Sequence, residues 1–440
     1  MKYIKKIYHY LIALLSYIYY GRPSRKMIVI GVTGTKGKST TCSYISSVLR
    51  AGGKKVAVLS TVEFRIGDKR ELNTKKMTML GRGKIHKFLE EAVKQGCQYV
   101  IVETSSEGIL QYRHKFLNYD IGIFTNLGTE HQERHGGFEN LKHDKAKMFS
   151  EISKHKKKID GKKIEKIIIV NGDDDNHEYF LNFKADEKYI FGIGNLERFS
   201  EKEFNIVMGE NIGDRNGGNS FQVDGIKFKP QILGDFNIYN ALASICVGKT
   251  QGILDEEIKK GVEDVKLVEG RMEFIDEGQD FKVVVDFAHE PMSYKELFTS
   301  LKKIALPIGG AIEGAKPKLI GIVGSDGGGR DIGKRKEMGS IAGEFCDIVI
   351  VTDVNCYDED PEEIAEMLAL GARESGKKDG ENLFIEIDRK KAIKLAFEKA
   401  QAGDVVAITA KGTEPCIAIE KGKTIPWDDR EIAKEVLKSL

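Results

Sequence analysis

A glycine-rich turn that ends in Lys-Ser-Thr follows the first strongly apolar stretch, at residues 31–40 (GVTGTKGKST). Its glycines let backbone N–H groups turn toward one point, its second lysine can neutralise terminal phosphates, and a hydroxyl in the next helical turn can bind Mg²⁺. Val32 stands where a full phosphate-binding loop has its first glycine, so the pattern is a shortened loop. The residues predicted to surround the phosphates are Gly34, Thr35, Lys36, Gly37, Lys38, Ser39 and Thr40.

Polar side chains follow two further apolar stretches. YVIVETSSEG ends its apolar run at Glu103, and the run ending at residue 124 leads into Asn126 and His131. Because the carboxyl ends of parallel strands meet at one edge of an open sheet, these side chains are expected near Lys38. Oxygen ligands of this kind suit Mg²⁺. The sequence therefore predicts a nucleotide and metal site at one sheet edge.

The elements that must hold this site alternate regularly along the sequence. Short apolar runs (MIVIGV, KVAVLS, YVIVET, IGIFTN, KIIIVN) alternate with longer amphipathic stretches, which is typical of an α/β protein with strands buried on both faces. A second set of alternating segments begins after residue 265, with the apolar runs FKVVVDF, PKLIGIVG, DIVIVTD and DVVAITA. We expect a mostly parallel phosphate-loop domain at 27–266 and a smaller Rossmann-like α/β domain at 267–440. The lysine-rich stretch 154–166 is predicted to be a solvated connection.

The bulk composition excludes several classes of protein. Across 440 residues, 69 basic and 67 acidic side chains leave a net charge of +2, which gives no general attraction to nucleic acid or anionic membranes. The six cysteines are scattered without C-x-x-C pairs. This spacing argues against a zinc ribbon or a disulfide scaffold and favours a reducing cytoplasm.

Residues 1–26 form a separate, apolar segment that we predict to be an amphipathic helix. Its apolar core is shorter than the ~20 residues that a membrane span needs, and no small-residue cleavage site of a signal peptide follows. Two interpretations stay open. The helix docks on the protein itself, or residues 4–20 lie on the inner surface of a membrane as a peripheral contact.

Ten short motifs together resemble the Mur ligase family, most closely its UDP-N-acetylmuramoyl-tripeptide synthetase (MurE) branch. In chain order they are TGTKGKSTT, ETSSEG, TNLGTEHQERHGGFEN, NGDDDN, LGDFNIYNALA, GRMEF, VVVDFAHEP, GGGRDIGKR, DVNCYDEDP and AKGTEP. The resemblance, which runs from Met27 to the C-terminus, implies a cytoplasmic, monomeric, ATP-dependent ligase of peptidoglycan precursor synthesis. Such an enzyme converts the carboxylate of a UDP-N-acetylmuramoyl-dipeptide-like acceptor to an acyl phosphate, which the amino group of an amino acid attacks.

The resemblance also implies roles for single residues. One Mg²⁺ is held by Ser39 or Thr40 with Glu103, and a second by Glu103 with His131. A lysine carbamylated by CO₂ matches Lys145, with Lys147 as the alternative. Further residues implied in catalysis or in ATP binding are Asn237, Asn240, Arg271, Asp286 and His289. Those implied in binding the acceptor are Ser106, Gln111 and Arg113, and those for the incoming amino acid are Arg330, Asn355, Tyr357, Gly412 and Glu414.

Departures from the family pattern limit what can be transferred. Family members that choose meso-diaminopimelate carry D-N-P-R, whereas this chain has V-N-C-Y with Tyr357 in place of the arginine. A neutral phenol cannot grip a distal carboxylate, so we predict a lysine-like or similar side chain. Only residues 1–26 precede the loop domain, so the usual UDP-binding domain is not expected. The alternatives are a folylpolyglutamate synthase-like ligase, a Mur-like ligase acting on another cell-wall polymer, and a non-catalytic nucleotide-binding scaffold.

Overall fold

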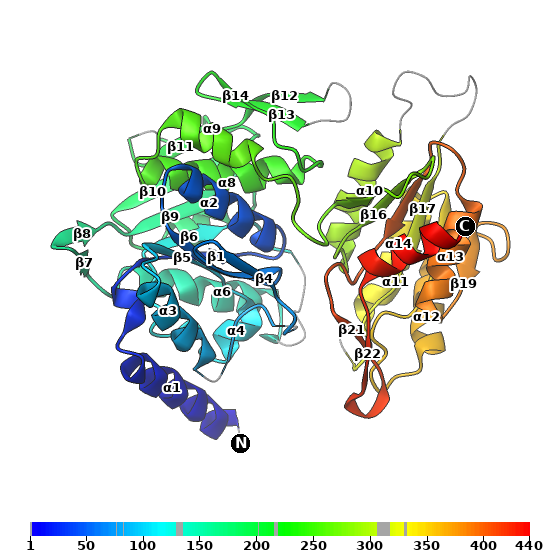
Figure 1. Ribbon diagram of the computed structural model, residues 1–440, viewed down its shortest axis with the longest axis horizontal. Helices are drawn as coiled ribbons and strands as arrows, with labels where there is room; N and C mark the ends of the chain where they lie inside the picture. Colours follow the sequence, from blue (N-terminus) through cyan, green and yellow to red (C-terminus); the bar gives the residue numbers. More distant parts are fainter. Residues whose placement is uncertain are drawn as a thin grey trace. The chain divides into compact units, whose positions relative to one another are not determined.

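The chain folds into two compact units, which are seen here in a computed structural model (Figure 1). The structure describes residues 2–75, 77–81, 83–128, 135–200, 202–214, 219–305, 317–329 and 332–440. Unit 1 comprises the chain up to Asp214, a segment ending at Gln231, and Asp235–Lys266. Unit 2 comprises Ile232–Gly234 and Leu267–Leu440.

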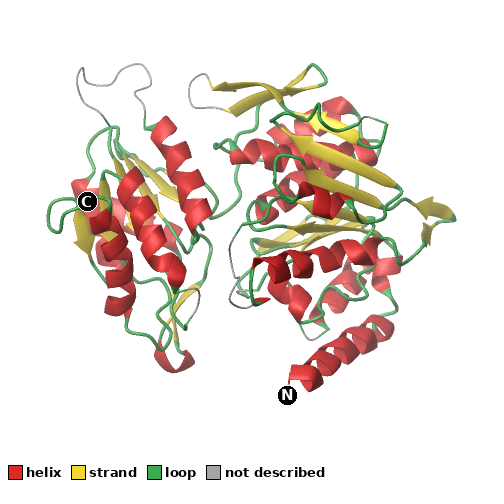
Figure 2. Cartoon of the chain, turned by 180° about the vertical axis from the view of Figure 1, so that it is seen from behind, coloured by secondary structure: helices red, strands yellow, loops and turns green. Residues whose placement is uncertain are grey.

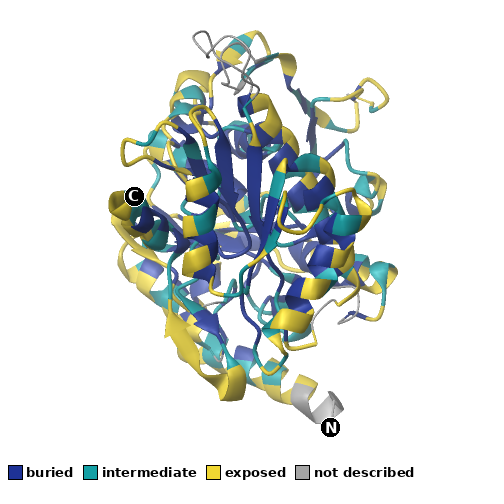
Figure 3. Ribbon diagram, turned by 90° about the vertical axis from the view of Figure 1, so that its right-hand side faces the viewer, coloured by how far each residue is buried: buried dark blue, intermediate teal, exposed yellow. Residues whose placement is uncertain are grey.

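Unit 1 is built on one large sheet, in which the described strands have the order β11-β10-β9-β6-β1-β5-β2-β3-β4. All neighbours pair in parallel except β2 with β3 and β3 with β4, which are antiparallel. The central strands are buried on both faces, as their unbroken apolar runs predict. The central strands of unit 2, which faces the viewer in Figure 3, are buried in the same way. The strands are β1 (Ile28–Thr33), β2 (Val56–Leu59), β3 (Glu63–Ile66), β4 (Lys69–Leu72), β5 (Tyr99–Glu103), β6 (Ile121–Phe124), β9 (Ile167–Asn171), β10 (Glu187–Gly192) and β11 (Asn205–Met208).

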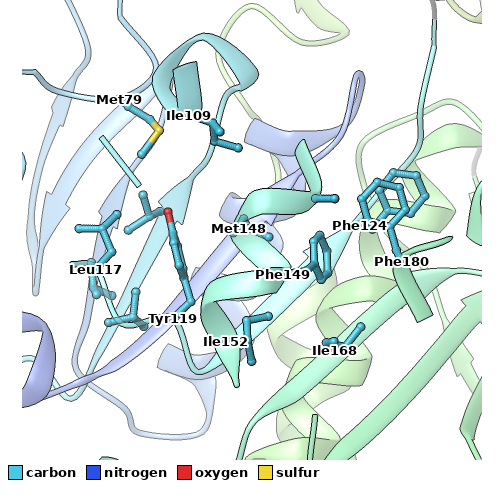
Figure 4. Close-up of a cluster of buried hydrophobic side chains, with 14 of the residues drawn as sticks. Met79, Ile109, Leu117, Tyr119, Phe124, Met148, Phe149, Ile152, Ile168 and Phe180 are labelled. Atoms are coloured by element: carbon cyan, nitrogen blue, oxygen red, sulfur yellow. The ribbon is translucent and has the colours of Figure 1, made fainter. Parts of the chain in front are cut away.

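Helices cover this sheet and supply the other half of the core. On one side, Phe149 of α6 packs in a cluster with Phe124 of β6 and Phe180 of α7 (Figure 4). The rings of Phe124 and Phe180 stack with 3.8 Å between their centroids. The helices of unit 1 after the first are α2 (Lys38–Ala51), α3 (Lys84–Lys94), α4 (Ser106–Leu110), α6 (Phe138–Ile152), α7 (His177–Leu181), α8 (Phe236–Thr250) and α9 (Asp255–Glu263). Smaller sheets are β7 (Lys157–Ile159) with β8 (Lys162–Ile164), and β12 (Glu210–Asp214) with β13 (Asn219–Val223) and β14 (Ile226–Phe228).

Unit 2 has a second sheet with helices on both faces (Figure 2). Its described strands have the order β15-β16-β20-β17-β18-β19, all parallel except β15 with β16. The strands are β15 (Glu273–Ile275), β16 (Lys282–Val285), β17 (Leu319–Val323), β18 (Ile348–Val351), β19 (Leu383–Ile385) and β20 (Val405–Ile408), with a hairpin of β21 (Cys416–Ala418) and β22 (Thr424–Pro426). The helices are α10 (Pro291–Ile304), α11 (Gly333–Phe345), α12 (Pro361–Glu374), α13 (Arg389–Lys399) and α14 (Asp429–Ser439). Together the two units confirm the predicted α/β class.

The lysine-rich stretch 154–166 is mostly exposed, as predicted for a solvated connection, but two of its lysines are buried. It forms the β7–β8 hairpin, and the ammonium groups of Lys157 and Lys166 are buried against the carboxylate of Asp120. The Lys166 Nζ donates to Asp120 Oδ1 at 2.6 Å. Burial lowers the pKa of Lys157 to about 8 even though Asp120 opposes the shift. A buried charge needs this kind of pairing, which composition alone does not reveal.

The N-terminal segment is a helix, α1 (Lys2–Tyr19), that lies beside α3 in unit 1 (Figure 1). One face docks on the unit: the rings of Tyr10 and Tyr17 lie 5.3 Å and 5.5 Å from the ring of Phe116. The opposite face leaves a row of apolar side chains exposed: Ile7, Leu11, Leu15, Ile18 and Tyr19. Among the described residues, no helix combines the length and apolarity that crossing a membrane requires.

Candidate functional site

The phosphate loop lies between β1 and α2, as predicted from its sequence. Gly34 and Gly37 both have positive φ angles, of 152° and 78°. A side chain at either position would also collide with neighbours, since an added Cβ would lie 2.0 Å from Thr125 Oγ1 at Gly34 and 2.3 Å from Asn240 Oδ1 at Gly37. Only glycine adopts a positive φ angle without strain and has no Cβ atom to collide with these neighbours. The N-terminus of α2 points at the centre of the loop.

Glu103 lies beside this helix N-terminus because β5 pairs with β1, with Glu103 opposite Val32. Its carboxylate is 2% exposed and accepts hydrogen bonds from Ser39 Oγ at 3.0 Å and from the backbone N–H of Thr61 at 2.7 Å. The Thr61 hydroxyl donates to the other oxygen at 3.0 Å. Of the two hydroxyls that the sequence left open, Ser39 is the one that contacts Glu103. Thr61, at the end of β2, was not foreseen.

The end of β6 braces the loop from the other side. The backbone N–H of Lys36 donates to Asn126 Oδ1 at 2.8 Å, and that of Thr35 donates to the Asn126 carbonyl at 2.9 Å. The Thr125 hydroxyl donates to the carbonyl of Lys36 at 2.7 Å. Lys38, the predicted phosphate ligand, donates from Nζ to the Thr35 carbonyl at 2.8 Å, which folds its side chain over the loop. His131 lies outside the described residues.

The two candidate lysines of α6 point in different directions. Lys145 is 4% exposed, and its Nζ donates to the carbonyl of Gly34 at 2.8 Å, so the amine reaches the phosphate loop. Lys147 instead forms an ion pair with Asp144 three residues earlier, and its side chain is 40% exposed. Asp144 also contacts His135 Nδ1 at 2.5 Å, and these partners lower its pKa against the opposing effect of burial. Helix packing thus selects Lys145 as the residue at the loop.

Asn237 and Asn240 lie on the first turns of α8 and contact one another. Asn240 Nδ2 donates to Asn237 Oδ1 at 2.9 Å, and Thr41 Oγ1 of α2 donates to Asn240 Oδ1 at 3.0 Å. Both side chains are buried next to Gly37. The pair therefore sits against the phosphate loop, where an amide could reach a nucleotide. The nearby Cys42 is not a nucleophile candidate, because burial, with Glu103 as a further cause, raises its thiol pKa.

The donor set at this edge fits a divalent cation with hard oxygen ligands. Among the described residues, no three His, Cys, Asp or Glu side chains gather into a metal cluster. A hydroxyl and a carboxylate converge instead, at Ser39 and Glu103, where phosphate oxygens and water would complete the shell. Mg²⁺ commonly takes one or two protein ligands together with substrate phosphates, so the arrangement suits Mg²⁺ better than a fully protein-ligated ion.

The predicted acceptor residues lie on and after α4, the short helix that follows β5. Ser106 is buried in the first turn of α4, behind the N-cap Ser105. Arg113 donates from Nη2 to Gln111 Oε1 at 2.6 Å and from Nη1 to the Met79 carbonyl at 2.5 Å. The structure therefore brings Gln111 and Arg113 together and ties them to the loop after β4. Desolvation lowers the pKa of the Arg113 guanidinium, which stays charged at neutral pH.

Unit 2 holds the remaining predicted residues in two groups. In the first, the guanidinium of Arg271 stacks on the ring of Phe287 at 4.4 Å, and the ring of His289 lies 4.5 Å from the same phenyl group. Asp286 accepts backbone hydrogen bonds from Met272 at 2.8 Å and Ala288 at 2.7 Å. The phenyl ring of Phe287 thus packs against both side chains.

The second group in unit 2 surrounds Asn355. Its Nδ2 donates to Asp326 Oδ1 at 2.8 Å and to Glu414 Oε2 at 3.0 Å. The fully buried Lys411 donates to the same Glu414 oxygen at 2.9 Å. Glu414 therefore forms an ion pair with Lys411 inside unit 2. Lys411, inside the AKGTEP motif, was missed because nothing in the sequence marks it as Glu414's partner.

Tyr357 and Gly412 lie at strained points of the backbone in unit 2. Tyr357 has φ 54° and its N–H donates to the Ala418 carbonyl at 3.2 Å, while Gly412 has φ 52°. A Cβ at Gly412 would lie 2.9 Å from both the Gly270 carbonyl oxygen and the Phe287 Cβ, so glycine is required where the two groups of unit 2 adjoin. Arg330 lies outside the described residues.

A phosphate loop, an acidic strand end and a buried lysine on one sheet edge define a nucleotide-dependent enzyme. Comparison with known proteins gives its class. Residues 32–248 match the model of the Mur ligase middle domain, and residues 270–412 match that of the Mur ligase glutamate ligase domain. The chain belongs to the Mur ligase family and is an ATP-dependent ligase. Members of this family use ATP and Mg²⁺, in agreement with the oxygen donors described above.

Individual relatives resemble the chain along nearly its full length. The UDP-N-acetylmuramyl-tripeptide synthetase of Roseiflexus sp. (strain RS-1) is 33% identical over 437 residues, which cover 98% of this chain and 82% of the relative. The enzyme of the same name from Treponema denticola is 36% identical over 432 residues, covering 96% and 78%. A solved UDP-N-acetylmuramoyl-L-alanyl-D-glutamate–2,6-diaminopimelate ligase superposes with a TM-score of 0.58 at 25% identity, covering 94% of this chain and 79% of that one.

Proposed function

We propose that the protein joins an amino acid to the free carboxylate of a UDP-N-acetylmuramoyl-dipeptide-like acceptor in peptidoglycan precursor synthesis. The observation that carries the proposal is the gathering of the phosphate loop, Glu103 and Lys145 at one edge of the unit 1 sheet. In this reaction an acceptor oxygen attacks the γ-phosphorus of ATP and ADP leaves. The amine then attacks the acyl carbon, an amide forms, and phosphate departs with the acceptor oxygen.

The difficulty of this reaction is charge, because an anionic carboxylate must approach an anionic triphosphate. Lys38 would neutralise the terminal phosphates, and Ser39 with Glu103 would hold one Mg²⁺ against them. That ion would supply electrostatic stabilisation of the charge that develops on the transferred group. Asn240 would bind the base, with Asn237 supporting the turn. Arg271, Asp286 and His289 of unit 2 are proposed as further ATP-binding or catalytic residues.

Lys145 is proposed as the carbamylated lysine, paired with a second Mg²⁺. A lysine that has taken up CO₂ becomes an anion and can then help to bind a cation. The position of Lys145 supports the assignment, since its amine is buried and within 2.8 Å of the loop carbonyl of Gly34. Lys147 forms an ion pair with Asp144 at the helix surface instead.

The incoming amino acid would bind unit 2 near Asn355, Gly412 and Glu414, with Arg330 as a further ligand predicted from sequence. Tyr357 in place of an arginine favours an amino acid whose side chain has no distal carboxylate. The names of some relatives include 2,6-diaminopimelate ligase, and the proposal for this chain differs from those names because it rests on Tyr357. On the acceptor side, Ser106, Gln111 and Arg113 would contact the acceptor molecule. The protein would work as a cytoplasmic monomer on these small molecules, without nucleic acid.

The exposed face of α1 supports a peripheral contact with an anionic membrane surface. Residues 2–26 contain six lysines or arginines and no acidic residue, and the apolar row at Ile7, Leu11 and Leu15 faces away from the unit. Co-sedimentation with phosphatidylcholine vesicles should require added phosphatidylglycerol and should be lost in Leu11→Asp. The matched control is Leu254→Asp, which changes another exposed leucine of unit 1. Equal binding by both variants would contradict the membrane contact.

The proposed reaction is tested by a turnover screen with ATP, Mg²⁺ and UDP-N-acetylmuramoyl-dipeptide, in which each amino acid is supplied in turn. Phosphate release is expected only when acceptor and amino acid are both present, and lysine-like amino acids should be preferred. Folylpolyglutamate precursors serve as the competing acceptor. Turnover with these, or phosphate release that ignores the acceptor, would contradict the proposal.

A further inference from the structure

A cavity of about 340 Å³ lies in unit 1 between α1 and the elements that carry the predicted acceptor residues. One wall is the inner face of α1, with His9, Ile12 and Ala13. The other walls come from the loop after β4, from the start of α3, and from the turn after α4, including Gln111 and Arg113. It is separate from the outward apolar row of α1.

The cavity carries an unusual buried side chain, His86 of α3. His86 is 1% exposed, and neither of its ring nitrogens has a hydrogen-bond partner among the residues that the structure describes. Burial lowers its pKa to about 4, so the neutral ring offers one N–H donor and one nitrogen acceptor. Unpaired buried polar groups are costly, and one that borders a cavity is satisfied when a polar ligand enters.

The remaining lining defines what such a ligand looks like. Ile12, Ala13, Leu80 and Ile85 form apolar walls that suit a flat ring, and Arg113 supplies positive charge at one side. The Arg113 hydrogen bonds to Gln111, to the Met79 carbonyl and to the Met77 sulfur use three of its five N–H donors, and the other two could meet phosphate oxygens. A pyrimidine base attached to a diphosphate combines these features. The volume is near the lower end of ligand pockets, roughly 300–1,000 Å³, so it suits one end of a larger molecule.

The position of the cavity connects it to the reaction edge. Arg113 holds the carbonyl of Met79, and the neighbouring Thr78 hydroxyl bonds the Thr61 hydroxyl at 2.9 Å. Thr61 in turn donates to Glu103. A continuous strip of residues 77–79 therefore runs from the cavity to the predicted metal edge, along which an extended acceptor could lie with its carboxylate at Glu103.

We propose that this cavity binds the uridine diphosphate end of the acceptor, with α1 as one wall and His86 as the residue that reads the base. The inference rests on the proposed function, because it assumes a nucleotide-linked acceptor.

The test measures UDP binding to the full chain by isothermal titration calorimetry, independently of turnover. His86→Leu should weaken UDP binding at least tenfold. His114→Leu is the matched control and should change it less than twofold. Like His86, His114 is buried and its ring nitrogens have no hydrogen-bond partner among the described residues, but it does not line the cavity. ADP in excess should not displace UDP.

A second pair of variants keeps the test decisive where a buried substitution disturbs folding. Ile12→Trp fills the cavity from the α1 wall and should abolish UDP binding, whereas Leu15→Trp on the exposed side of the same helix should not. UDP binding that survives Ile12→Trp and His86→Leu, or that ADP displaces, overturns the inference. Turnover of the acceptor without any UDP binding also overturns the inference about the cavity, but it supports the proposed reaction. UDP binding at the cavity without turnover refutes the reaction instead.

Discussion

His86 offers a quantitative test of the unit 1 structure, because its buried ring makes stability depend on pH. An unfolded histidine titrates near pH 6.5, whereas burial lowers the folded pKa of His86 to about 4. Between these values the unfolded chain binds more protons, so stability falls as the pH drops. Integration from pH 7 to pH 5 gives a loss of about 2 kcal/mol from this one residue.

The perturbation is His86→Leu, which removes the titrating ring and keeps an apolar side chain of similar size. The wild-type protein should lose about 2 kcal/mol more unit 1 stability between pH 7 and pH 5 than the variant. His114→Leu should give a similar difference, because burial lowers the His114 pKa to about 3. Carboxylates elsewhere titrate alike in all three proteins and cancel in the comparison.

The assay must report on unit 1 alone. The single tryptophan, Trp427, lies in unit 2, so its fluorescence does not serve. Hydrogen exchange followed by mass spectrometry on peptides from β1 and β5 measures opening of the unit 1 core, with β17 peptides of unit 2 as the internal reference. Identical pH dependence in wild type and His86→Leu would show that the ring is not buried as described, and would refute the reasoning.

Three further predictions concern the reaction edge and the amino acid site. Lys145→Ala should lower turnover on the order of 100-fold and be partly rescued by a short carboxylate such as acetate, while Lys147→Ala stays within a few-fold of wild type; equal losses without rescue would argue against a carbamate. Glu103→Gln keeps the shape of the side chain but should lower turnover on the order of 100-fold and raise the Mg²⁺ concentration for half-maximal rate; an unchanged Mg²⁺ profile would remove Glu103 from the metal site. Tyr357→Arg should raise the rate with meso-diaminopimelate relative to lysine; an unaltered ratio in amino acid competition would place selectivity elsewhere.

Much of the reaction edge could be predicted from the sequence because it is locally encoded. The loop at 31–40 joins one strand to one helix, so its glycines and Lys38 are set by neighbours in the chain. The place of Glu103 followed from a general rule, that parallel strands end at one edge, which the pairing of β5 with β1 confirms. The α/β class followed from the alternation of buried runs.

Contacts between distant segments could not be predicted in this way. The burial of Lys157 and Lys166 on Asp120 depends on long-range pairing, and a lysine-rich run looks the same whether solvated or paired. Whether Lys145 or Lys147 lies at the loop depends on which face of α6 meets it. The cavity beside His86 depends on where α1 docks, for which the sequence of α1 alone carries no signal.

The central claim is that the acceptor carboxylate is activated by direct transfer of phosphate from ATP. It is tested most directly with an acceptor labelled with ¹⁸O in its free carboxylate, followed by mass spectrometry of the released phosphate. With both carboxylate oxygens labelled, the acyl-phosphate route predicts that the released phosphate carries one ¹⁸O atom and that the carbonyl of the new amide keeps the other. Unlabelled phosphate released alongside amide formation would contradict an acyl phosphate.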